Sequence, residues 1–201
     1  ADRPALSRIS FTAEPGEVIA IIGSTGAGKS TLVHLLLRFY DVQSGSILVD
    51  GVDVRRMTQE QLRAKIGYVP QQTVLFSGSV RENIGYGKAG AGQGEIARAA
   101  AIAQADQFIA VLKEGYDAAI GQGGGNLSGG QKQRLAIARA LVRQPEIYVF
   151  DDCFSALDFK TDARLRAALK EATKEATVIM VAQRVSTVMH ADRIIVLDEG
   201  R

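Results

Sequence analysis

The sequence has few of the residues that build disulfides or histidine-rich metal sites. Among its 201 residues there are one cysteine, Cys153, and two histidines, His34 and His190. A single cysteine excludes an internal disulfide and fits a reducing compartment. Two histidines cannot form a histidine-rich metal site. We expect Cys153 and His34 to pack in the interior and His190 to lie at a helix end.

Long hydrophobic runs and an excess of either charge are also missing. No apolar run approaches the length of a bilayer-spanning helix, and no signal peptide is visible. The 24 basic and 22 acidic residues give a net charge of +2, which carries no sign of nucleic-acid binding. With 46% hydrophobic residues the chain can form a full core. We therefore expect the chain as given to be soluble, so that any membrane role depends on a partner or on further sequence.

A glycine-rich loop is the strongest local signal in the sequence. It fits the phosphate-binding pattern G-x-x-x-x-G-K-[ST] with Gly23, Ser24, Thr25, Gly26, Ala27, Gly28, Lys29, Ser30 and Thr31. The apolar run 18–22 before it predicts a buried strand, and residues 32–40 after it have a helical pattern. A glycine turn that merely precedes a lysine is the alternative, and the flanking strand and helix argue against it.

This loop predicts a site for nucleotide phosphates with Mg²⁺. Glycines let backbone N–H groups face phosphate oxygens, and the helix start adds the positive end of its dipole. In this pattern Lys29 would reach the β- and γ-phosphates and Ser30 would ligate Mg²⁺.

The rest of the chain alternates between strand and helix patterns. Turn and capping signals include Asp50-Gly51 and the capping boxes at 58–61 and 79–82. No strand signal appears between about residues 78 and 125, so we expect an all-helical insertion there. The alternation elsewhere predicts a parallel sheet with helices on both faces. Besides the strand at 18–22, we expect strands at 9–12, 46–50, 66–69, 147–150, 177–181 and 193–197.

Four further motifs, in order along the chain, carry a resemblance to a known family. Leu127-Ser128-Gly129-Gly130-Gln131 matches the signature of the ATP-binding-cassette (ABC) family, and Gln71 after 68–70 matches its Q-loop. Asp151, at the end of the 147–150 strand, matches the Walker B acid, and 155–158 match the D-loop. Over essentially all 201 residues the chain resembles the nucleotide-binding domain of an ABC transporter.

The resemblance implies an α/β fold of the P-loop NTPase (RecA-like) type. It would have a parallel-sheet core, an N-terminal antiparallel β subdomain and an inserted all-helical subdomain. The implied boundaries are one domain over 1–201, with 1–78 and 140–201 as the core and 79–139 as the helical subdomain that carries the signature. Both ends would be truncated, with the transmembrane domain absent and the adenine-stacking residue upstream of Ala1.

The resemblance also implies partners and ligands. Two such domains would form a head-to-tail dimer in which Ser128, Gly129, Gly130 and Gln131 of one complete the ATP site on the loop of the other. Ser30, Gln71 and Asp151 would hold Mg²⁺. The stretch 74–84 resembles exporters more than importers. The domain would then lie at the cytoplasmic face of the inner membrane, on the transmembrane domain of its own full-length chain, and would not bind nucleic acid.

Two departures from the family pattern concern the catalytic residues, which by resemblance are Asp152, Gln183 and Gln71. The family has Glu where this chain has Asp152, and His where it has Gln183, just before the family-like 184–187. Asp is one methylene shorter, and a misplacement of about 1 Å can cost about 10²-fold in rate. An amide cannot carry charge or shuttle a proton. The pair resembles the degenerate half of a heterodimeric exporter, whose partner chain would keep the Glu and the His.

Other interpretations stay open. Asp152 alone could be a harmless change with water bridging the gap, and the chain could then be a fully active ATPase of a homodimeric exporter. A soluble ABC protein that uses ATP as a clamp in DNA repair or translation is a third class. The near-neutral charge and the exporter-like stretch argue against that class. The transported cargo is not predicted.

Overall fold

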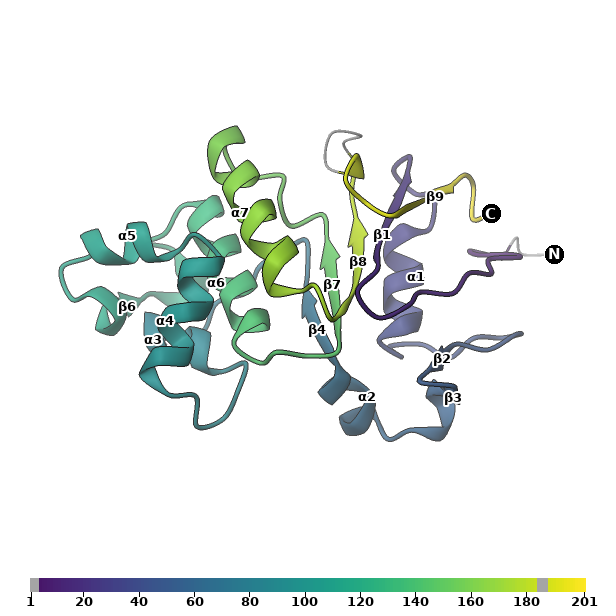
Figure 1. Cartoon of the computed structure of the whole chain (residues 1–201), viewed down its shortest axis with the longest axis horizontal. Coiled ribbons are helices and arrows are strands. Elements are labelled where there is room, and N and C mark those ends of the chain that lie inside the picture. The colour runs from purple at the N-terminus through teal and green to yellow at the C-terminus, as the bar shows by residue number, and fades with distance from the viewer. Residues whose placement is uncertain (1–3, 184–187) are drawn as a thin grey trace. The chain divides into compact units, whose positions relative to one another are not determined.

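The computed structural model describes residues 4–183 and 188–201 (Figure 1). The chain divides into two compact units. The first unit comprises the chain up to Tyr68 together with 146–152 and 175–201, and the second comprises 69–145 and 153–174.

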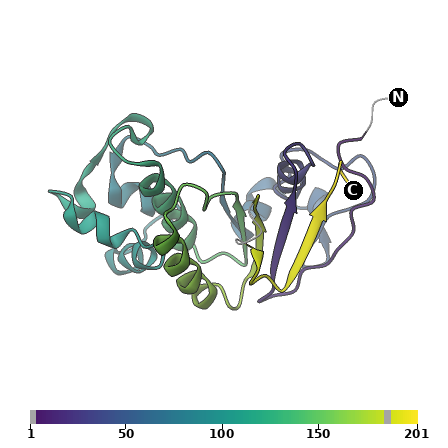
Figure 2. The same cartoon turned by 90° about the horizontal axis from the view of Figure 1, so that it is seen from above.

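A five-stranded sheet forms the centre of the first unit, in the order β4-β7-β8-β1-β9. Its strands are β1 (Val18–Gly23), β4 (Ile66–Val69), β7 (Ile147–Asp151), β8 (Thr177–Val181) and β9 (Arg193–Leu197). The pairs β7–β8, β8–β1 and β1–β9 are parallel, and Figure 2 shows β1 and β9 running side by side. The predicted parallel-sheet core of the α/β class is confirmed.

Short antiparallel strands accompany this sheet. The strands β2 (Leu48–Val49) and β3 (Val52–Asp53) form a hairpin. Its turn residues Asp50 and Gly51 have φ values of 51° and 75°, the left-handed conformation that a type I′ turn requires. The expected strand at 9–12 is not formed, because none of the described residues pairs with it in a sheet.

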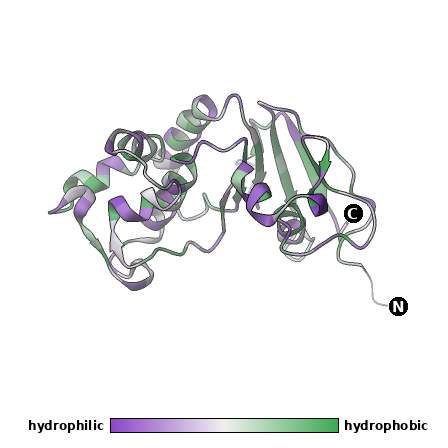
Figure 3. Cartoon of the chain, turned by 90° about the horizontal axis from the view of Figure 1, so that it is seen from below, coloured by the Kyte–Doolittle hydropathy of each residue, from purple (hydrophilic) through white to green (hydrophobic). Residues whose placement is uncertain are grey.

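The first unit carries short helices, and the helix expected over 32–40 instead runs from Lys29 to Leu36. These helices are α1 (Lys29–Leu36), the 3₁₀ helix η1 (Val54–Arg56) and α2 (Gln59–Lys65). The Thr58 side chain accepts a hydrogen bond from the Gln61 N–H while the Gln61 side chain accepts one from the Thr58 N–H, so the predicted capping box is confirmed. Figure 3 shows that residues of the sheet strands are predominantly hydrophobic.

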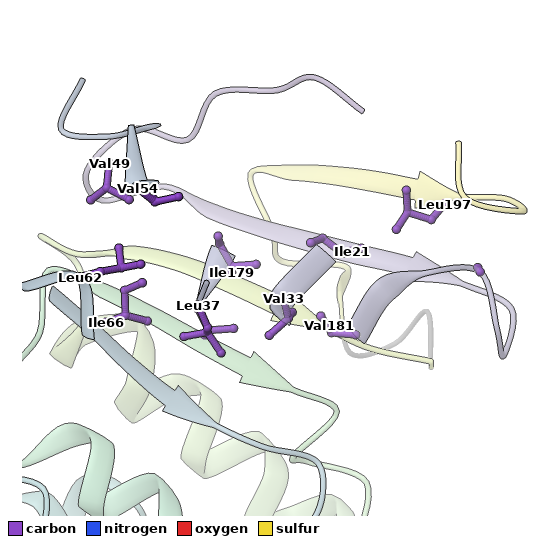
Figure 4. Close-up of a cluster of buried hydrophobic side chains, with 12 residues drawn as sticks. Ile21, Val33, Leu37, Val49, Val54, Leu62, Ile66, Ile179, Val181 and Leu197 are labelled. Carbon is purple, nitrogen blue, oxygen red and sulfur yellow. The ribbon is translucent and has the colours of Figure 1, made fainter. Parts of the chain in front are cut away.

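The core of the first unit joins α1 to the sheet. Val33 and Leu37 lie among Ile21, Ile179 and Val181 (Figure 4), and each of these five side chains is at most 7% exposed. Burying an aliphatic side chain of this size contributes about 1.5–3 kcal/mol. This packing anchors the helix that follows the glycine-rich loop.

The second unit is mostly helical. Its elements are β5 (Gly78–Ser79), α3 (Val80–Gly85), α4 (Gln93–Ile102), α5 (Asp106–Val111), η2 (Gly115–Asp117), β6 (Ala119–Ile120), η3 (Gln122–Gly124), α6 (Gly129–Leu141) and α7 (Phe159–Ala172). Helix α6 packs against α3 and α4. The region expected to be all-helical also contains the antiparallel strand pair β5–β6. The sequence did not predict these strands because two residues are too few to show a periodic pattern. None of the helices in the described part of the chain combines the length and the apolar character that crossing a bilayer requires.

Candidate nucleotide-binding site

The glycine-rich loop joins the end of β1 to the start of α1, as its sequence predicts. Gly28 is the N-cap of α1 with φ 102°, and a Cβ there would lie 2.6 Å from Cδ2 of Leu6. A Cβ at Gly23 would lie 2.3 Å from the carbonyl oxygen of Leu197, at the end of β9. Glycine is therefore required at both positions, at one by backbone conformation and crowding and at the other by the close approach of a strand.

Lys29 is held inside this loop. Its side chain is 8% exposed, and Nζ donates hydrogen bonds to the carbonyl oxygens of Gly23 at 2.7 Å and Ser24 at 2.8 Å. The exposed residues of the same loop are Ser24, Thr25, Gly26 and Ser30. A positive charge thus lies under a solvent-accessible loop whose backbone N–H groups are at a helix start.

Asp151 ends β7, and it is 4% exposed. Burial raises the pKa of its carboxyl group above the ordinary value, and the neighbouring Asp152 acts in the same direction. His34 and Lys29 act in the opposite direction, as positive charges do. The Tyr68 hydroxyl donates a long hydrogen bond of 3.5 Å to Asp151 Oδ2. This buried carboxylate is a good candidate for a cation ligand, because a cation would relieve the cost of burying its charge.

Asp152 and Gln183 are in direct contact. The strands β7 and β8 are parallel neighbours with Asp151 paired to Val181, so the residues that follow each strand emerge at the same edge. Gln183 Nε2 donates a hydrogen bond of 3.0 Å to Asp152 Oδ2. The Asp152 N–H donates to the Val181 carbonyl oxygen at 2.9 Å, and its φ of 46° lies in the left-handed region, which Asp tolerates better than most residues.

The residues of the family-like signature start helix α6. Ser128 is the N-cap: its hydroxyl accepts from the Gln131 N–H at 3.2 Å, and the Gln131 side chain accepts from the Ser128 N–H at 2.9 Å. A Cβ at Gly130 would lie 3.1 Å from the carbonyl oxygen of Ala156, within the D-loop-like segment. The signature is therefore also a capping box, and its second glycine allows close packing on 155–158.

The predicted site residues divide between the two units. The first unit brings together the loop residues, Asp151, Asp152 and Gln183. Gln71, in the chain that follows β4, belongs to the second unit with Ser128, Gly129, Gly130 and Gln131. The segment 184–187 lies outside the described residues.

Two residues near Asp151 were expected only to pack. Tyr68 lies on β4, next to β7 in the sheet, and His34 lies in the last turn of α1. The signal that could have placed Tyr68 here is its position near the carboxyl end of a predicted strand, the edge at which Asp151 also lies. Cys153 is fully buried, as expected.

The fold and this site define an α/β P-loop domain. The profile of the family described as ABC transporter matches residues 6–155, and the chain belongs to that family. An uncharacterized ABC transporter ATP-binding protein of Mycobacterium tuberculosis is 52% identical over 100% of this chain and 35% of its own length. An ATP-dependent lipid A-core flippase of Syntrophus aciditrophicus is 47% identical over 99% of this chain and 33% of its own length.

A solved structure agrees with this assignment. The structure of a bacterial Atm1-family ABC exporter with ATP bound superimposes with a TM-score of 0.96 and is 46% identical, covering 99% of this chain and 35% of that chain. The chain thus spans about a third of the length of these relatives. ABC domains bind ATP and hydrolyse it, and the chain is an ATP-binding domain of this type.

Proposed function

We propose that this chain is the slowly hydrolysing motor domain of a membrane exporter and that it carries the degenerate site of a heterodimeric pair. The observation behind the slow hydrolysis is the hydrogen bond between the Gln183 amide and the Asp152 carboxylate. The export role is supported by the similarity to a lipid A-core flippase and to an Atm1-family exporter.

MgATP would be bound mainly by residues of the first unit. The amides at the start of α1 and the ammonium group of Lys29 suit phosphate oxygens. The Ser30 hydroxyl, the Asp151 carboxylate and the Gln71 amide oxygen are the oxygen ligands that Mg²⁺ prefers. When bound, Mg²⁺ would withdraw charge from those phosphate oxygens. The described residues contain no group of three or more His, Cys, Asp or Glu that could hold a metal ion.

Slow hydrolysis follows from the geometry at the edge of the sheet. The shorter Asp152 would hold its carboxylate back from the attacking water, and the Gln183 amide competes with that water for Oδ2. A misplacement of about 1 Å costs on the order of 10²-fold, and loss of a positioned base costs about 10²–10⁴-fold. Phosphate binding depends on other residues and would be retained.

The partner would be a second ABC nucleotide-binding domain, from a different chain with the Glu and the His. The start of α6 offers it the Ser128 hydroxyl and the N–H groups of Gly129 and Gly130 at the positive end of a 13-residue helix. These groups would complete the partner's ATP site, where productive hydrolysis would take place.

An exposed apolar surface on the second unit suits contact with a transmembrane domain of the same full-length protein. Val74, Phe76 and Tyr86 are 62%, 44% and 71% exposed. Two thirds of each relative lies outside the region that this chain matches, which leaves ample length for membrane helices. We therefore place the domain at the cytoplasmic face of the inner membrane, and its net charge of +2 does not favour nucleic acid as a partner.

The test compares ATP turnover by the full-length protein, without a partner, with turnover by its Asp152→Glu, Gln183→His double variant. We expect the double variant to hydrolyse at least about 10²-fold faster, with an unchanged affinity for a fluorescent ATP analogue. Equal rates would overturn the degenerate-site proposal and leave a fully active ATPase in its place.

A further inference from the structure

Arg139 joins helix α6 to the exposed surface of the second unit. It lies in the last turn of α6, the helix that begins at the signature. Its guanidinium group donates three hydrogen bonds: Nε to the Asn83 carbonyl oxygen at 2.8 Å, Nη2 to Asn83 Oδ1 at 2.9 Å, and Nη1 to the Val74 carbonyl oxygen at 3.0 Å. One planar group therefore connects α6 to both α3 and the loop before it.

The same guanidinium group supports the exposed aromatic rings. Its Cζ lies 5.0 Å from the ring centroid of Phe76 and 5.9 Å from that of Tyr86. The two ring centroids are 4.7 Å apart. Cation–π contacts of this kind are attractive, so Arg139 holds both the backbone and the rings of this surface.

Asn83 completes the connection from the other side. It is 2% exposed, and its Nδ2 donates to the carbonyl oxygens of Phe76 at 2.9 Å and Ser79 at 3.1 Å. Its Oδ1 also accepts from the Phe76 N–H at 3.0 Å. Asn83 thereby connects α3 back to residues 76 and 79, and Arg139 connects Asn83 to α6.

A backbone contact at Gly87 supports the same link. A Cβ at Gly87 would lie 1.9 Å from the carbonyl oxygen of Arg139. Only a glycine lets the chain that leaves α3 approach α6 this closely. The two elements are thus in contact at the backbone as well as through the arginine side chain.

We propose that Arg139 is a positioning residue that makes the surface 74–86 and the start of α6 move as one piece. The proposal rests on the proposed function, in which that surface contacts the transmembrane domain and Ser128–Gln131 contact the partner's ATP. The helix between them is stiff because its buried face, which includes Leu135, Ile137 and Ala138, is packed in the unit. A displacement at one end is then transmitted to the other, which is the physical requirement for coupling between two sites.

Replacing Arg139 by lysine tests this role, because the two side chains carry the same charge but differ in hydrogen-bonding geometry. Arg139→Lys keeps the charge and most of the aliphatic stem, but a single ammonium group cannot reproduce three planar donations and two ring contacts. Arg134→Lys is the matched control on the same helix. Arg134 also lies over a ring, 4.8 Å from the Phe108 centroid. It donates to the Gln104 carbonyl oxygen at 2.7 Å and weakly to the Gly130 carbonyl oxygen at 3.3 Å, and none of these contacts involves the segment 74–86.

The experiment is hydrogen exchange, read by mass spectrometry, on the full-length protein with its partner in lipid nanodiscs, with and without MgATP. In the unaltered protein and in Arg134→Lys, MgATP should slow exchange at the start of α6 and also change it in 74–86. In Arg139→Lys the change at the start of α6 should persist while the change in 74–86 is reduced about fivefold or more, the lower end of common coupling factors.

Three other outcomes would contradict the proposal or the proposed function on which it rests. An unchanged MgATP response of 74–86 in Arg139→Lys overturns the role of Arg139. Faster exchange throughout the second unit, irrespective of MgATP, also overturns it and makes the arginine a purely structural residue. If MgATP does not slow exchange at the glycine-rich loop and α6 even in the unaltered protein, the proposed function itself fails.

Discussion

The side-chain amide of Gln183 and the carboxylate of Asp152 are hydrogen-bonded, with 3.0 Å between Nε2 and Oδ2. They follow the neighbouring parallel strands β8 and β7, so both lie at the edge where Asp151 lies. The two residues that we propose to slow hydrolysis are therefore in direct contact with each other.

The first prediction is that changes at these two residues are not additive in ATP turnover. Asp152→Glu alone places a longer carboxylate against the amide, and Gln183→His alone leaves the carboxylate short. Residues in direct contact commonly show interaction energies of about 0.5–3 kcal/mol. A double-mutant cycle on the turnover rate should give a value in this range, and additivity within about 0.3–0.5 kcal/mol would contradict it.

The second prediction concerns Gly28. Gly28→Ala forces a side chain into a backbone conformation with φ 102° and against Leu6. We expect a loss of about 1–3 kcal/mol in the free energy of unfolding and weaker ATP binding.

The control for Gly28 is Gly94→Ala. Gly94 is in helix α4, and a Cβ there would meet nothing within 4 Å. Alanine should stabilise the helix at this position by about 0.5–1 kcal/mol. Urea denaturation measures both variants, and equal effects would show that the conformation of the loop does not require glycine.

The third prediction separates the two roles of Ser128. Ser128→Ala removes an N-cap and should cost about 0.5–2 kcal/mol of stability. It should also lower hydrolysis by a co-assembled partner roughly tenfold or more, because a hydrogen bond to a charged group contributes about 1.5–3 kcal/mol. ATP binding to this chain should change much less.

Thr58→Ala is the matched variant for Ser128, because Thr58 caps α2 with the same capping box. It should cost a similar amount of stability without affecting the partner's hydrolysis. The head-to-tail arrangement would be wrong if both variants slowed the partner equally.

The fourth prediction concerns the pH dependence of stability at Asp151. Burial raises the pKa of its carboxyl group in the folded state, so the folded protein binds this proton more readily than the unfolded chain does. Its contribution to the free energy of unfolding is therefore present below the unfolded pKa, near 3.9, and is lost as pH rises through the folded pKa.

It follows that Asp151→Asn should stabilise the nucleotide-free protein at pH 7, by about 0.5–2 kcal/mol, and stabilise it less near pH 4. Binding of MgATP should weaken in the same variant. Thermal unfolding at the two pH values measures the effect. A lower melting temperature at pH 7 would show that the carboxylate is stabilised by its neighbours to a greater extent than burial destabilises it.

Much of the fold could be predicted from local sequence. The boundaries of β8 and β9 agree with the expected ones at both ends, and the capping boxes at Thr58 and Ser79 are formed. These features depend on neighbouring residues alone. The expected strand at 9–12 was wrong, because a strand needs a partner to bond with, and its own composition does not supply one.

The candidate site was predictable as a set of residues but not as a set of contacts. Sequence motifs identified the loop, Asp151, Asp152 and Gln183. They did not show that Gln183 binds Asp152, that Tyr68 and His34 lie near Asp151, or that Arg139 is tied to Asn83. The residues of the first of these contacts are 31 positions apart and those of the last are 56 positions apart, too far for any local pattern to report.

The sequence by itself therefore determined which groups this chain carries: a phosphate-binding loop, the family signature, and Asp152 and Gln183 directly after two strands. Each is a short pattern whose physical meaning is contained within a few residues. Tertiary structure alone decided which of these groups touch, because the order β4-β7-β8-β1-β9 places the ends of strands that are distant in the chain at one edge. The close approach of Leu197 to Gly23 is also a result of the sheet, because the pairing of β9 with β1 places these two residues side by side.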